Sequence, residues 1–251
     1  MDHLSYSSIG RYLRCPRSWK YHYIDKKPSP MNPSLFTGSF YHDMIAYLYT
    51  QIMNGVINAH QMDLKPVMAS FWKAKKPEEV DWGKEDQAEL RRSVAQAVEK
   101  YRANIMPKYK PLAVEKKMTM NVEGVQILAY IDLRAVRNDG KELVADHKWR
   151  KKSVPDQTIT NDIQSIVYSM LTGLDLFEFH EALHRTSFFG SHVDIRIREV
   201  ERREHDRDLL KEIIHDVLNG ISKEVFPPNP TNYLCSPQYC EFWTECRMRW
   251  L

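Results

Sequence analysis

The sequence predicts an α/β fold in which helices flank a central sheet, and two observations lead to this prediction. Residues 125–149 form two runs in which apolar and polar side chains alternate, and the turn-forming triplet Asn138, Asp139 and Gly140 separates them. Other segments repeat apolar residues every three or four positions, as helices with one buried face do. With 251 residues, the chain is long enough to bury a full core as one domain.

Composition and charge exclude some classes of protein. The net charge of +3 is too small to indicate a nucleic-acid binder by itself, so the local distribution of charge matters more. No run of about 18 apolar residues is present, and no apolar stretch follows a basic N-terminal segment. We therefore expect a cytoplasmic protein without a membrane partner. Four cysteines in a reducing compartment are more typical of metal binding than of disulfides.

The first 110 residues are expected to be mainly helical. Pro16 lacks a backbone donor and should break the first helix at Cys15. A later helix places Gly38 and His42 on one face, where the glycine permits close approach of a ligand or of another backbone. The segments expected here are a short helix and an aromatic stretch within 5–23, a helix over 37–53, an irregular segment over 55–84 and a scaffold helix over 85–105.

The rest of the chain is expected to hold the sheet and its last helices. A helix over 160–174 carries an apolar stripe, with Gln164 and Tyr168 four residues apart at its margin. These two side chains either face a cleft or form a hydrogen-bonded pair at the edge of the core. The other expected elements are strands over 112–124 and 187–200, a helix over 202–221 and a cysteine-rich tail. The single domain is thus divided into a helical region (1–110), a sheet core (111–200) and a final helix with the tail (201–251).

Two acidic residues of the hairpin are candidates for a metal site. If the hairpin folds symmetrically about Asp139, then Asp132 lies opposite Asp146. Directly opposed like charges destabilise a sheet by up to about 1 kcal/mol, so a cation is expected between them. A divalent metal with oxygen ligands meets that need, and Lys148 on the same face can orient or deprotonate a water. Glu115 is a further candidate at this site. The alternative is a pair of exposed acids on a solvated face.

Two basic groups are candidates for contacts with nucleic-acid phosphates. One surrounds Trp149, whose ring could stack on a base, and consists of Lys148, Arg150, Lys151 and Lys152. The other repeats every third residue near the N-terminus and consists of Arg11, Arg14, Arg17 and Lys20. The alternative for the second group is a solvated helix face.

Several motifs, taken in order, resemble those of the RecB-like branch of the PD-(D/E)xK nuclease superfamily. The resemblance is strongest to the iron–sulphur members, which include CRISPR-associated RecB-like exonucleases and their viral relatives. The matching motifs are SYSSIGRYLRCPRSW at residues 5–19, G-x-x-x-H ending at His42, AYID ending at Asp132, D-x-K from Asp146 to Lys148, and Q-x-x-x-Y from Gln164 to Tyr168. Each motif alone is weak, but their order and spacing extend over nearly the whole chain.

The resemblance implies a restriction-endonuclease-like core with a central mixed sheet, a helical N-terminal region and a cysteine-rich C-terminal tail. It also implies a bound Mg²⁺ or Mn²⁺ ion. The implied ligands are the side chains of His42, Asp132 and Asp146 and the backbone carbonyl of His147. Lys148 would position or activate the attacking water. Gln164 and Tyr168 would orient that lysine and the DNA strand.

The resemblance also implies a [4Fe–4S] cluster that ties the two ends of the chain together. Its ligands would be Cys15, Cys235, Cys240 and Cys246. Family members commonly place two residues between the first two C-terminal cysteines, whereas four separate Cys235 from Cys240 here. Zinc therefore stays an alternative to the cluster.

The function that the resemblance implies is that of a metal-dependent DNA exonuclease acting on single strands or DNA ends in recombination or repair. A recombination or annealing protein is a candidate partner, and a viral member would act in the host cytoplasm. One alternative is a structure-specific flap endonuclease. Others are an iron–sulphur module that binds DNA without cutting it, and a redox sensor.

Overall fold

The structure, a computed structural model, describes residues 3–29, 31–56, 61–187 and 190–248. The chain forms two compact units, each built from separate segments. The larger unit comprises Met31–Met118 and Tyr130–Arg203, and the smaller comprises Met1–Pro30, Thr119–Ala129 and Glu204–Leu251. The single domain expected from the sequence stays a prediction.

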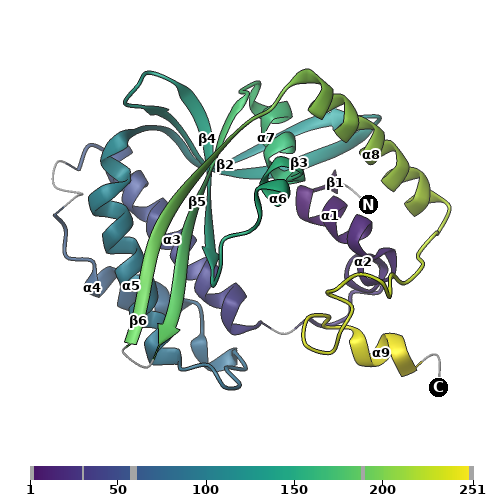
Figure 1. Ribbon diagram of the computed structural model, residues 1–251, viewed down its shortest axis with the longest axis horizontal. Helices are drawn as coiled ribbons and strands as arrows, with labels where there is room; N and C mark the ends of the chain where they lie inside the picture. Colours follow the sequence, from purple (N-terminus) through teal and green to yellow (C-terminus); the bar gives the residue numbers. More distant parts are fainter. Residues whose placement is uncertain (1–2, 30, 57–60, 188–189, 249–251) are drawn as a thin grey trace. The chain divides into compact units, whose positions relative to one another are not determined.

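The central sheet is mixed, with the strand order β1-β3-β4-β5-β6 and with β2 also paired to β3 (Figure 1). The strands are β1 (His3–Leu4), β2 (Tyr109–Val122), β3 (Val125–Arg137), β4 (Glu142–Arg150), β5 (Leu176–Ser187) and β6 (Gly190–Glu201). The pairs β3–β4 and β5–β6 are antiparallel, whereas β1–β3 and β4–β5 are parallel. The predicted mixed sheet flanked by helices is confirmed.

Several helices begin at side chains that cap them. Asn32, Asp86 and Asp162 each accept a hydrogen bond from the backbone N–H three residues further on, and Gly173 ends one helix with a φ of 72°. The described helices are α1 (Tyr6–Arg14), α2 (Pro16–Tyr23), α3 (Pro33–Met53), α4 (Lys65–Ala74), α5 (Gln87–Asn104), α6 (Asp156–Thr160), α7 (Ile163–Thr172), α8 (Glu204–Ser222) and α9 (Trp243–Met248), with 3-10 turns at Pro77–Glu79 and Met106–Lys108.

The β3–β4 hairpin has the register that the sequence predicts. Leu133 pairs with Ala145 and Val136 with Glu142, and the same register continued by one residue places Asp132 opposite Asp146. The turn closes where Arg137 N–H donates to the Lys141 carbonyl at 2.9 Å, and Gly140 has a φ of 84°. This positive φ accounts for the glycine of the turn.

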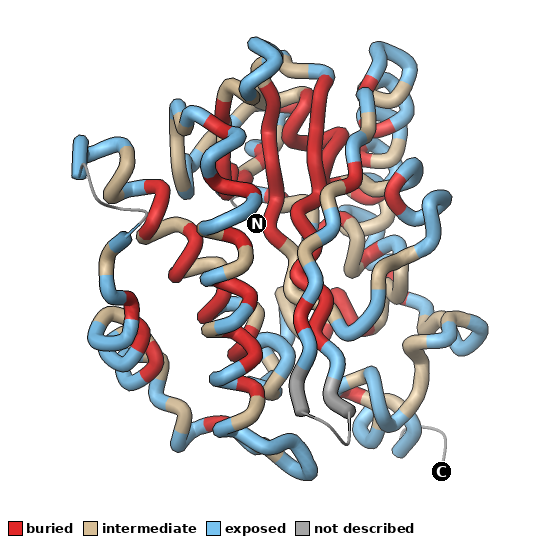
Figure 2. Tube along the Cα trace, turned by 60° about the vertical axis from the view of Figure 1, so that its left-hand side comes forward, coloured by how far each residue is buried: buried red, intermediate tan, exposed pale blue. Residues whose placement is uncertain are grey.

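Helices cover both faces of the strands in the larger unit. On β5, Phe177 faces α7, where it lies 5.8 Å from the ring of Tyr168, while His180 faces α5. Helices α3 and α5 pack against each other. Helix α3 also packs against β4, and α5 against β6. Figure 2 shows buried residues running along the strands.

The prediction that residues 55–84 are irregular was wrong, because this segment contains α4 and a 3-10 turn. The ring of Trp72 in α4 lies 4.9 Å from that of Phe36 and 5.0 Å from that of Phe40, so it packs edge-on against α3. The helix has only ten residues and a proline in its first turn, which left its apolar spacing too short to identify.

Strand β5 was missed altogether, although it lies between β4 and β6. Its residues Glu178, His180 and Glu181 are almost completely buried, so charged side chains interrupt the apolar pattern of a strand. Partners elsewhere in the larger unit satisfy them; for example, Arg150 Nη1 donates to Glu181 at 3.0 Å. The helix expected over 160–174 is present as the shorter α7, because Asp162 caps it, and the separate helix α6, which ends at Thr160, was not predicted.

The smaller unit contains the first two helices, α8 and the cysteine-rich tail. The predicted break at Cys15 is present, with extended backbone between α1 and α2. Tyr12 donates to the Val225 carbonyl at 2.7 Å, and Trp19 stacks on Phe226 with ring centroids 5.7 Å apart.

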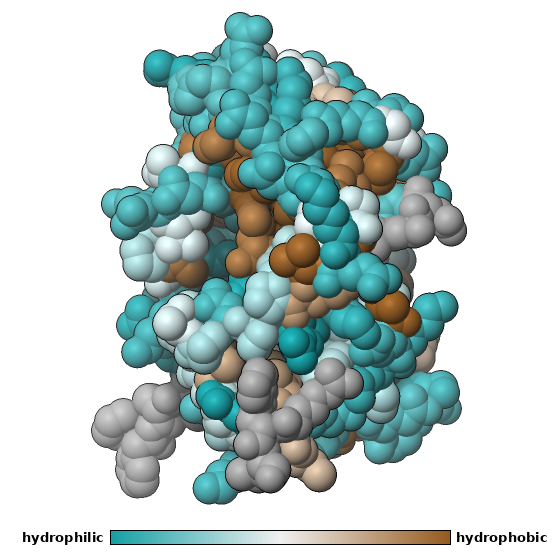
Figure 3. Space-filling model, turned by 90° about the vertical axis from the view of Figure 1, so that its right-hand side faces the viewer, coloured by the Kyte–Doolittle hydropathy of each residue, from teal (hydrophilic) through white to brown (hydrophobic). Residues whose placement is uncertain are grey.

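Figure 3 shows one face of the molecule, which is mostly hydrophilic with apolar patches. Within the described residues, we find no helix with the length and apolarity needed to cross a bilayer.

Candidate active site

The two hairpin aspartates are buried at neighbouring positions of β3 and β4. Asp132 is 8% exposed and Asp146 1% exposed. They are therefore not a pair of exposed acids on a solvated face, which was the alternative. Asp132 Oδ2 accepts a hydrogen bond of 2.9 Å from the backbone N–H of His147. Burial at this depth disfavours a charged carboxylate unless cations or donors compensate it.

Two imidazoles converge on the same oxygen of Asp132. His42 on α3 places Nδ1 3.1 Å from Oδ2, and His147 places its own Nδ1 3.6 Å from it. In the described part of the chain, these three residues form a group whose ligand atoms lie within 4.8 Å of one another. The His147 ring at this point is new, because the resemblance implied only its backbone carbonyl. Carboxylate oxygen and neutral imidazole are donors that suit a divalent metal.

The pKa shifts divide the site into ionised and neutral groups. Burial favours a raised pKa for Asp132, but the charge of His42 and the donors around the carboxylate outweigh it and hold this pKa well below its usual range. At His42, the Asp132 charge outweighs burial and raises the pKa. Burial lowers the pKa of His147 to about 4, so this ring is neutral near pH 7. At Asp146, burial outweighs the Lys148 ammonium and raises the pKa.

Gln164 and Tyr168 are buried within the site rather than at the margin of α7. Gln164 Oε1 accepts from Lys148 Nζ at 2.6 Å, and its Nε2 donates to Asp146 Oδ1 and, at 2.9 Å, to the Tyr168 hydroxyl. Tyr168 in turn donates to the Tyr130 carbonyl at 2.7 Å. Lys148 Nζ also lies 2.7 Å from Asp146 Oδ2. The Gln164 amide therefore holds both the Lys148 ammonium and the Asp146 carboxyl group in place.

Two further candidates flank this centre. Glu115 has a φ of 46° within β2, and burial together with the Asp132 charge raises its pKa to about 7, which indicates that its carboxyl is electrostatically coupled to the site. Gly38 lies beside Trp149, but an added Cβ would be 3.8 Å from the Trp149 Cβ, an ordinary contact. Close approach of another backbone therefore does not explain this glycine.

The basic candidates near β4 are engaged within the chain. Trp149 is stacked on His184 with centroids 4.2 Å apart, so one face of its ring is not open to a base. Arg150 pairs with Glu181 at 3.0 Å, and Lys151 Nζ lies 2.6 Å from Glu85. Lys152 is exposed.

The N-terminal candidates lie in the smaller unit. Arg11 donates to Ser18 at 3.1 Å and pairs with Glu241 at 2.5 Å, and Arg14 lines a cavity beside Cys15. Their proposed contacts with DNA stay a prediction.

The cysteines gather in the smaller unit, far along the chain from the aspartates. No disulfide joins them within the described residues, and all line one small cavity whose walls include Tyr21, Phe242 and Trp243. Burial raises the pKa of Cys240 and of Cys246. Free thiols converging on one mostly apolar cavity fit a bound metal or cluster.

Tyr101 is a site residue that sequence reasoning missed. Helix α5 was interpreted as scaffold, yet the Tyr101 hydroxyl lies 3.0 Å from His147 Nε2 and 2.6 Å from His180 Nδ1. A signal was present, because a tyrosine in a buried apolar stripe needs a partner for its hydroxyl. His180 was missed together with β5.

Comparisons with known proteins agree with this fold. A candidate exonuclease from Eubacterium rectale has a solved structure that is 14% identical, with a TM-score of 0.57 over 94% of this chain and 86% of that one. A second structure, SSO0001, is 13% identical, with a TM-score of 0.47 over 98% and 86%. No curated protein sequence matches significantly. The family model of the PD-(D/E)XK nuclease superfamily matches residues 3–247. This chain therefore belongs to the PD-(D/E)XK nuclease superfamily.

Proposed function

We propose that this nuclease is a metal-dependent DNA exonuclease that acts on single strands or DNA ends in recombination or repair. The observation that carries the proposal is the convergence of His42 and His147 on Asp132, beside a lysine that Gln164 fixes against Asp146. The structural neighbour from Eubacterium rectale, described as a candidate exonuclease, supports the same reaction. We place its action in the cytoplasm, with a recombination or annealing protein as its partner.

The site divides the work of phosphodiester hydrolysis among its residues. The residues that would hold Mg²⁺ or Mn²⁺ are His42, Asp132 and His147, whose ligand atoms converge, together with Asp146, which the hairpin register places opposite Asp132. A bound divalent cation supplies Lewis acidity and makes water a stronger nucleophile near neutral pH. Lys148 would hold the attacking water and offer a positive charge to the phosphate, and Gln164 accepts a hydrogen bond from its ammonium. Burial of the carboxylates keeps bulk water away from them.

Cleavage of three DNA substrates by the purified protein tests this proposal. Strands labelled at the 5′ end, strands labelled at the 3′ end and circular DNA are each incubated with Mg²⁺ or Mn²⁺. We expect stepwise shortening from an end and an intact circle. Asp132→Asn and Lys148→Met should each reduce the rate at least about a hundredfold in folded protein. Cutting of the circle would favour the flap-endonuclease alternative, and binding without any cutting would favour the non-cutting module.

We further propose that the four thiols hold a [4Fe–4S] cluster, because they line one cavity in the smaller unit. Protein purified without oxygen should be brown and contain about four irons per chain. A colourless protein with one zinc would replace the cluster with a zinc site. Absence of both metals would leave the thiols without this role.

A further inference from the structure

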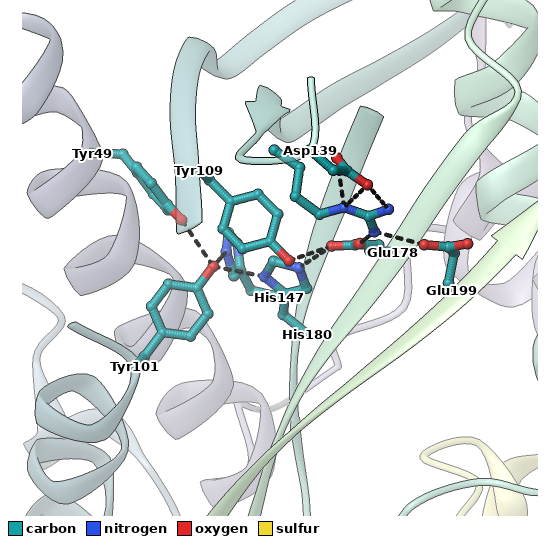
Figure 4. A network of polar contacts seen from close by, with 9 residues as sticks. Tyr49, Tyr101, Tyr109, Asp139, His147, Glu178, His180 and Glu199 are labelled. Carbon is teal, nitrogen blue, oxygen red and sulfur yellow. Dashed lines mark hydrogen bonds and ion pairs between the residues drawn. The ribbon is translucent and has the colours of Figure 1, made fainter. Parts of the chain in front are cut away.

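The second nitrogen of the His147 ring begins a chain of buried hydrogen bonds that leads away from the metal site (Figure 4). His147 Nε2 lies 3.0 Å from the Tyr101 hydroxyl, which lies 2.6 Å from His180 Nδ1. His180 Nε2 lies 2.8 Å from Glu178 Oε2, and Arg137 donates to the other carboxylate oxygen. The four residues that continue this chain of hydrogen bonds beyond His147 come from α5, β5 and the hairpin.

Glu178, at the outer end of this series of hydrogen bonds, sets their direction. Burial favours a raised pKa for Glu178, but donors around the carboxylate outweigh it and lower the pKa, so this group is ionised and only accepts. Tyr109 donates to it at 2.6 Å, and Arg137 also pairs with Glu199 at 2.6 Å. His180 must therefore donate through Nε2, which leaves Nδ1 as the ring nitrogen that can accept from Tyr101.

Tyr101 transmits this direction to His147. In this arrangement the Tyr101 hydroxyl donates its single proton to His180 Nδ1, which lies 2.6 Å away. The Tyr101 oxygen can then only accept from its other neighbours, which are His147 Nε2 and, at 3.1 Å, the Tyr49 hydroxyl. His147 thus carries its proton on Nε2. Its Nδ1 has a lone pair, and this is the nitrogen that lies 3.6 Å from Asp132 Oδ2.

A lone pair facing a carboxylate is unfavourable unless a cation lies near both. The opposite tautomer would direct an N–H toward Asp132, which favours the carboxylate but obstructs a metal. This series of hydrogen bonds favours the metal-binding tautomer of His147. Its members His147, His180 and Tyr101 are at most 2% exposed. Outer groups that orient a ligating histidine in this way commonly change metal affinity by about 10- to 100-fold.

We propose that His147 enters the metal site through its imidazole Nδ1, and that Tyr101 is the positioning residue that holds the proton on Nε2. The inference rests on the proposed metal-dependent function and deepens it, because it adds a side-chain ligand where the backbone carbonyl alone was expected. Glu178 and Arg137 act through Tyr101 as the outer end of the same chain.

The tautomer can be measured without metal and without DNA. Long-range ¹H–¹⁵N spectra of protein with ¹⁵N-labelled histidine distinguish protonated from unprotonated ring nitrogens, and His147→Phe identifies the signal. We expect a protonated Nε2 and an unprotonated Nδ1 in the wild type, and a mixture of tautomers in Tyr101→Phe. A proton on Nδ1 in the wild type, or an unchanged tautomer in Tyr101→Phe, overturns the proposal.

Mn²⁺ affinity of the same variants, measured by calorimetry without DNA, tests the ligand. Tyr101→Phe should bind about 10- to 100-fold more weakly, and His147→Phe at least as weakly. Tyr49→Phe is the matched control, because it removes a neighbouring buried hydroxyl 3.1 Å from that of Tyr101 and leaves the Tyr101 hydroxyl in place. It should bind as the wild type does, with equal near-UV spectra in all three. Wild-type affinity in His147→Phe would leave the carbonyl as the ligand and overturn the proposal.

The two sets of measurements distinguish this inference from the proposed function. If the wild type shows the expected tautomer and Mn²⁺ affinity but cuts no DNA, the proposed function is wrong and the inference stands. If cutting depends on Asp132 and Lys148 while Tyr101→Phe and His147→Phe keep their affinity, the inference is wrong and the proposed function stands. A wild type that binds no Mn²⁺ contradicts both.

Discussion

Gln164 uses both ends of its amide to hold two opposite charges. Its oxygen accepts from Lys148 and its nitrogen donates to Asp146, and the side chain is 3% exposed. Gln164→Leu keeps the size and removes these bonds. Leaving buried polar groups unpaired costs about 1–3 kcal/mol, so the free energy of unfolding should fall by that amount. DNA cleavage should fall at least about tenfold, because the lysine loses its orientation. Urea unfolding and cleavage rates measure the two effects.

Met170→Leu is the control for this change, since it alters the same helix with nearly equal volume and removes no hydrogen bond. It should leave both the stability and the cleavage rate close to wild type. A Gln164→Leu protein that cuts at the wild-type rate would remove Gln164 from the positioning of Lys148.

His184 should make the stability of the larger unit depend on pH. Burial, with a contribution from the Lys151 charge, lowers its pKa to about 4, whereas an unfolded chain has a histidine pKa of about 6.5. Below pH 6.5 the unfolded chain therefore binds a proton that the folded protein does not. The contribution of His184 is complete above this pH and is lost as the pH falls toward 4.

His184→Phe keeps an aromatic ring against Trp149 and removes the titration. Urea unfolding at several pH values should show a smaller loss of stability between pH 6.5 and pH 4 than in the wild type. Equal losses in the two proteins would assign the pH dependence to other groups.

The residues of the candidate site differ in how far the sequence could indicate them. Asp132 and Asp146 could be paired from the hairpin alone, because one turn and the two-residue period determine the register. Tyr101 and His180 reach the site across long stretches of chain, and no spacing rule relates such residues. The His147 ring was missed because the alternation of a strand assigned only Asp146 and Lys148 to the site.

At the scale of elements, the sequence indicated those with a regular apolar period. Helices α5 and α8 and the β3–β4 hairpin were predicted closely, since one face of each is apolar and the other polar. Strand β5 and the junction of α6 and α7 were not predicted. Their buried polar groups are compensated by side chains from elsewhere in the fold, which a local sequence pattern does not show. Arg202 is such a side chain.

Arg202 holds the junction between α6 and α7. Its guanidinium donates to the carbonyls of Ile159, at 2.8 Å, and Thr160, at 2.6 Å, and to the Ser165 hydroxyl, while only 2% of the residue is exposed. Arg202→Met leaves these acceptors buried without a donor and should lower the free energy of unfolding by at least about 2 kcal/mol. Arg202→Lys should rescue little, because an ammonium lacks the planar fork.

Chemical unfolding of these variants gives the measurement, and Arg196→Met is the control, because Arg196 is exposed on β6. The control should lie within about 0.5 kcal/mol of the wild type. Similar stabilities of Arg202→Met and Arg196→Met would show that the junction does not depend on the guanidinium.

At the scale of the whole molecule, the two candidate metal centres belong to different units. The residues around Asp132 all lie in the larger unit, and the four cysteines all lie in the smaller one. The smaller unit is assembled from segments far apart in the sequence, with about 220 residues between Cys15 and Cys235. Only the resemblance to a family could relate these ends from the sequence, because no local pattern extends over that distance.

A cluster on these cysteines should stabilise the smaller unit rather than take part in cleavage. Joining residues so far apart restricts the unfolded chain, and the metal–ligand bonds add folding free energy. Cys240→Ala should therefore lower the melting temperature and the soluble yield. Hydrogen exchange should quicken in α1, α2 and α8 while β4 and β5 stay protected. Protein that remains folded should still cleave DNA when Mn²⁺ is supplied.

Ser236→Ala is the matched control in the same tail, because the Ser236 hydroxyl is buried without a hydrogen-bond partner among the described residues and its loss removes no thiol. Its melting temperature should equal or exceed that of the wild type, since an unpaired buried hydroxyl does not stabilise the fold. If Cys240→Ala melts like this control but no longer cuts DNA, the thiols act in function. The same holds if cleavage follows the oxidation state of the cluster while stability stays constant. Only a fall in stability with cleavage retained supports a structural cluster.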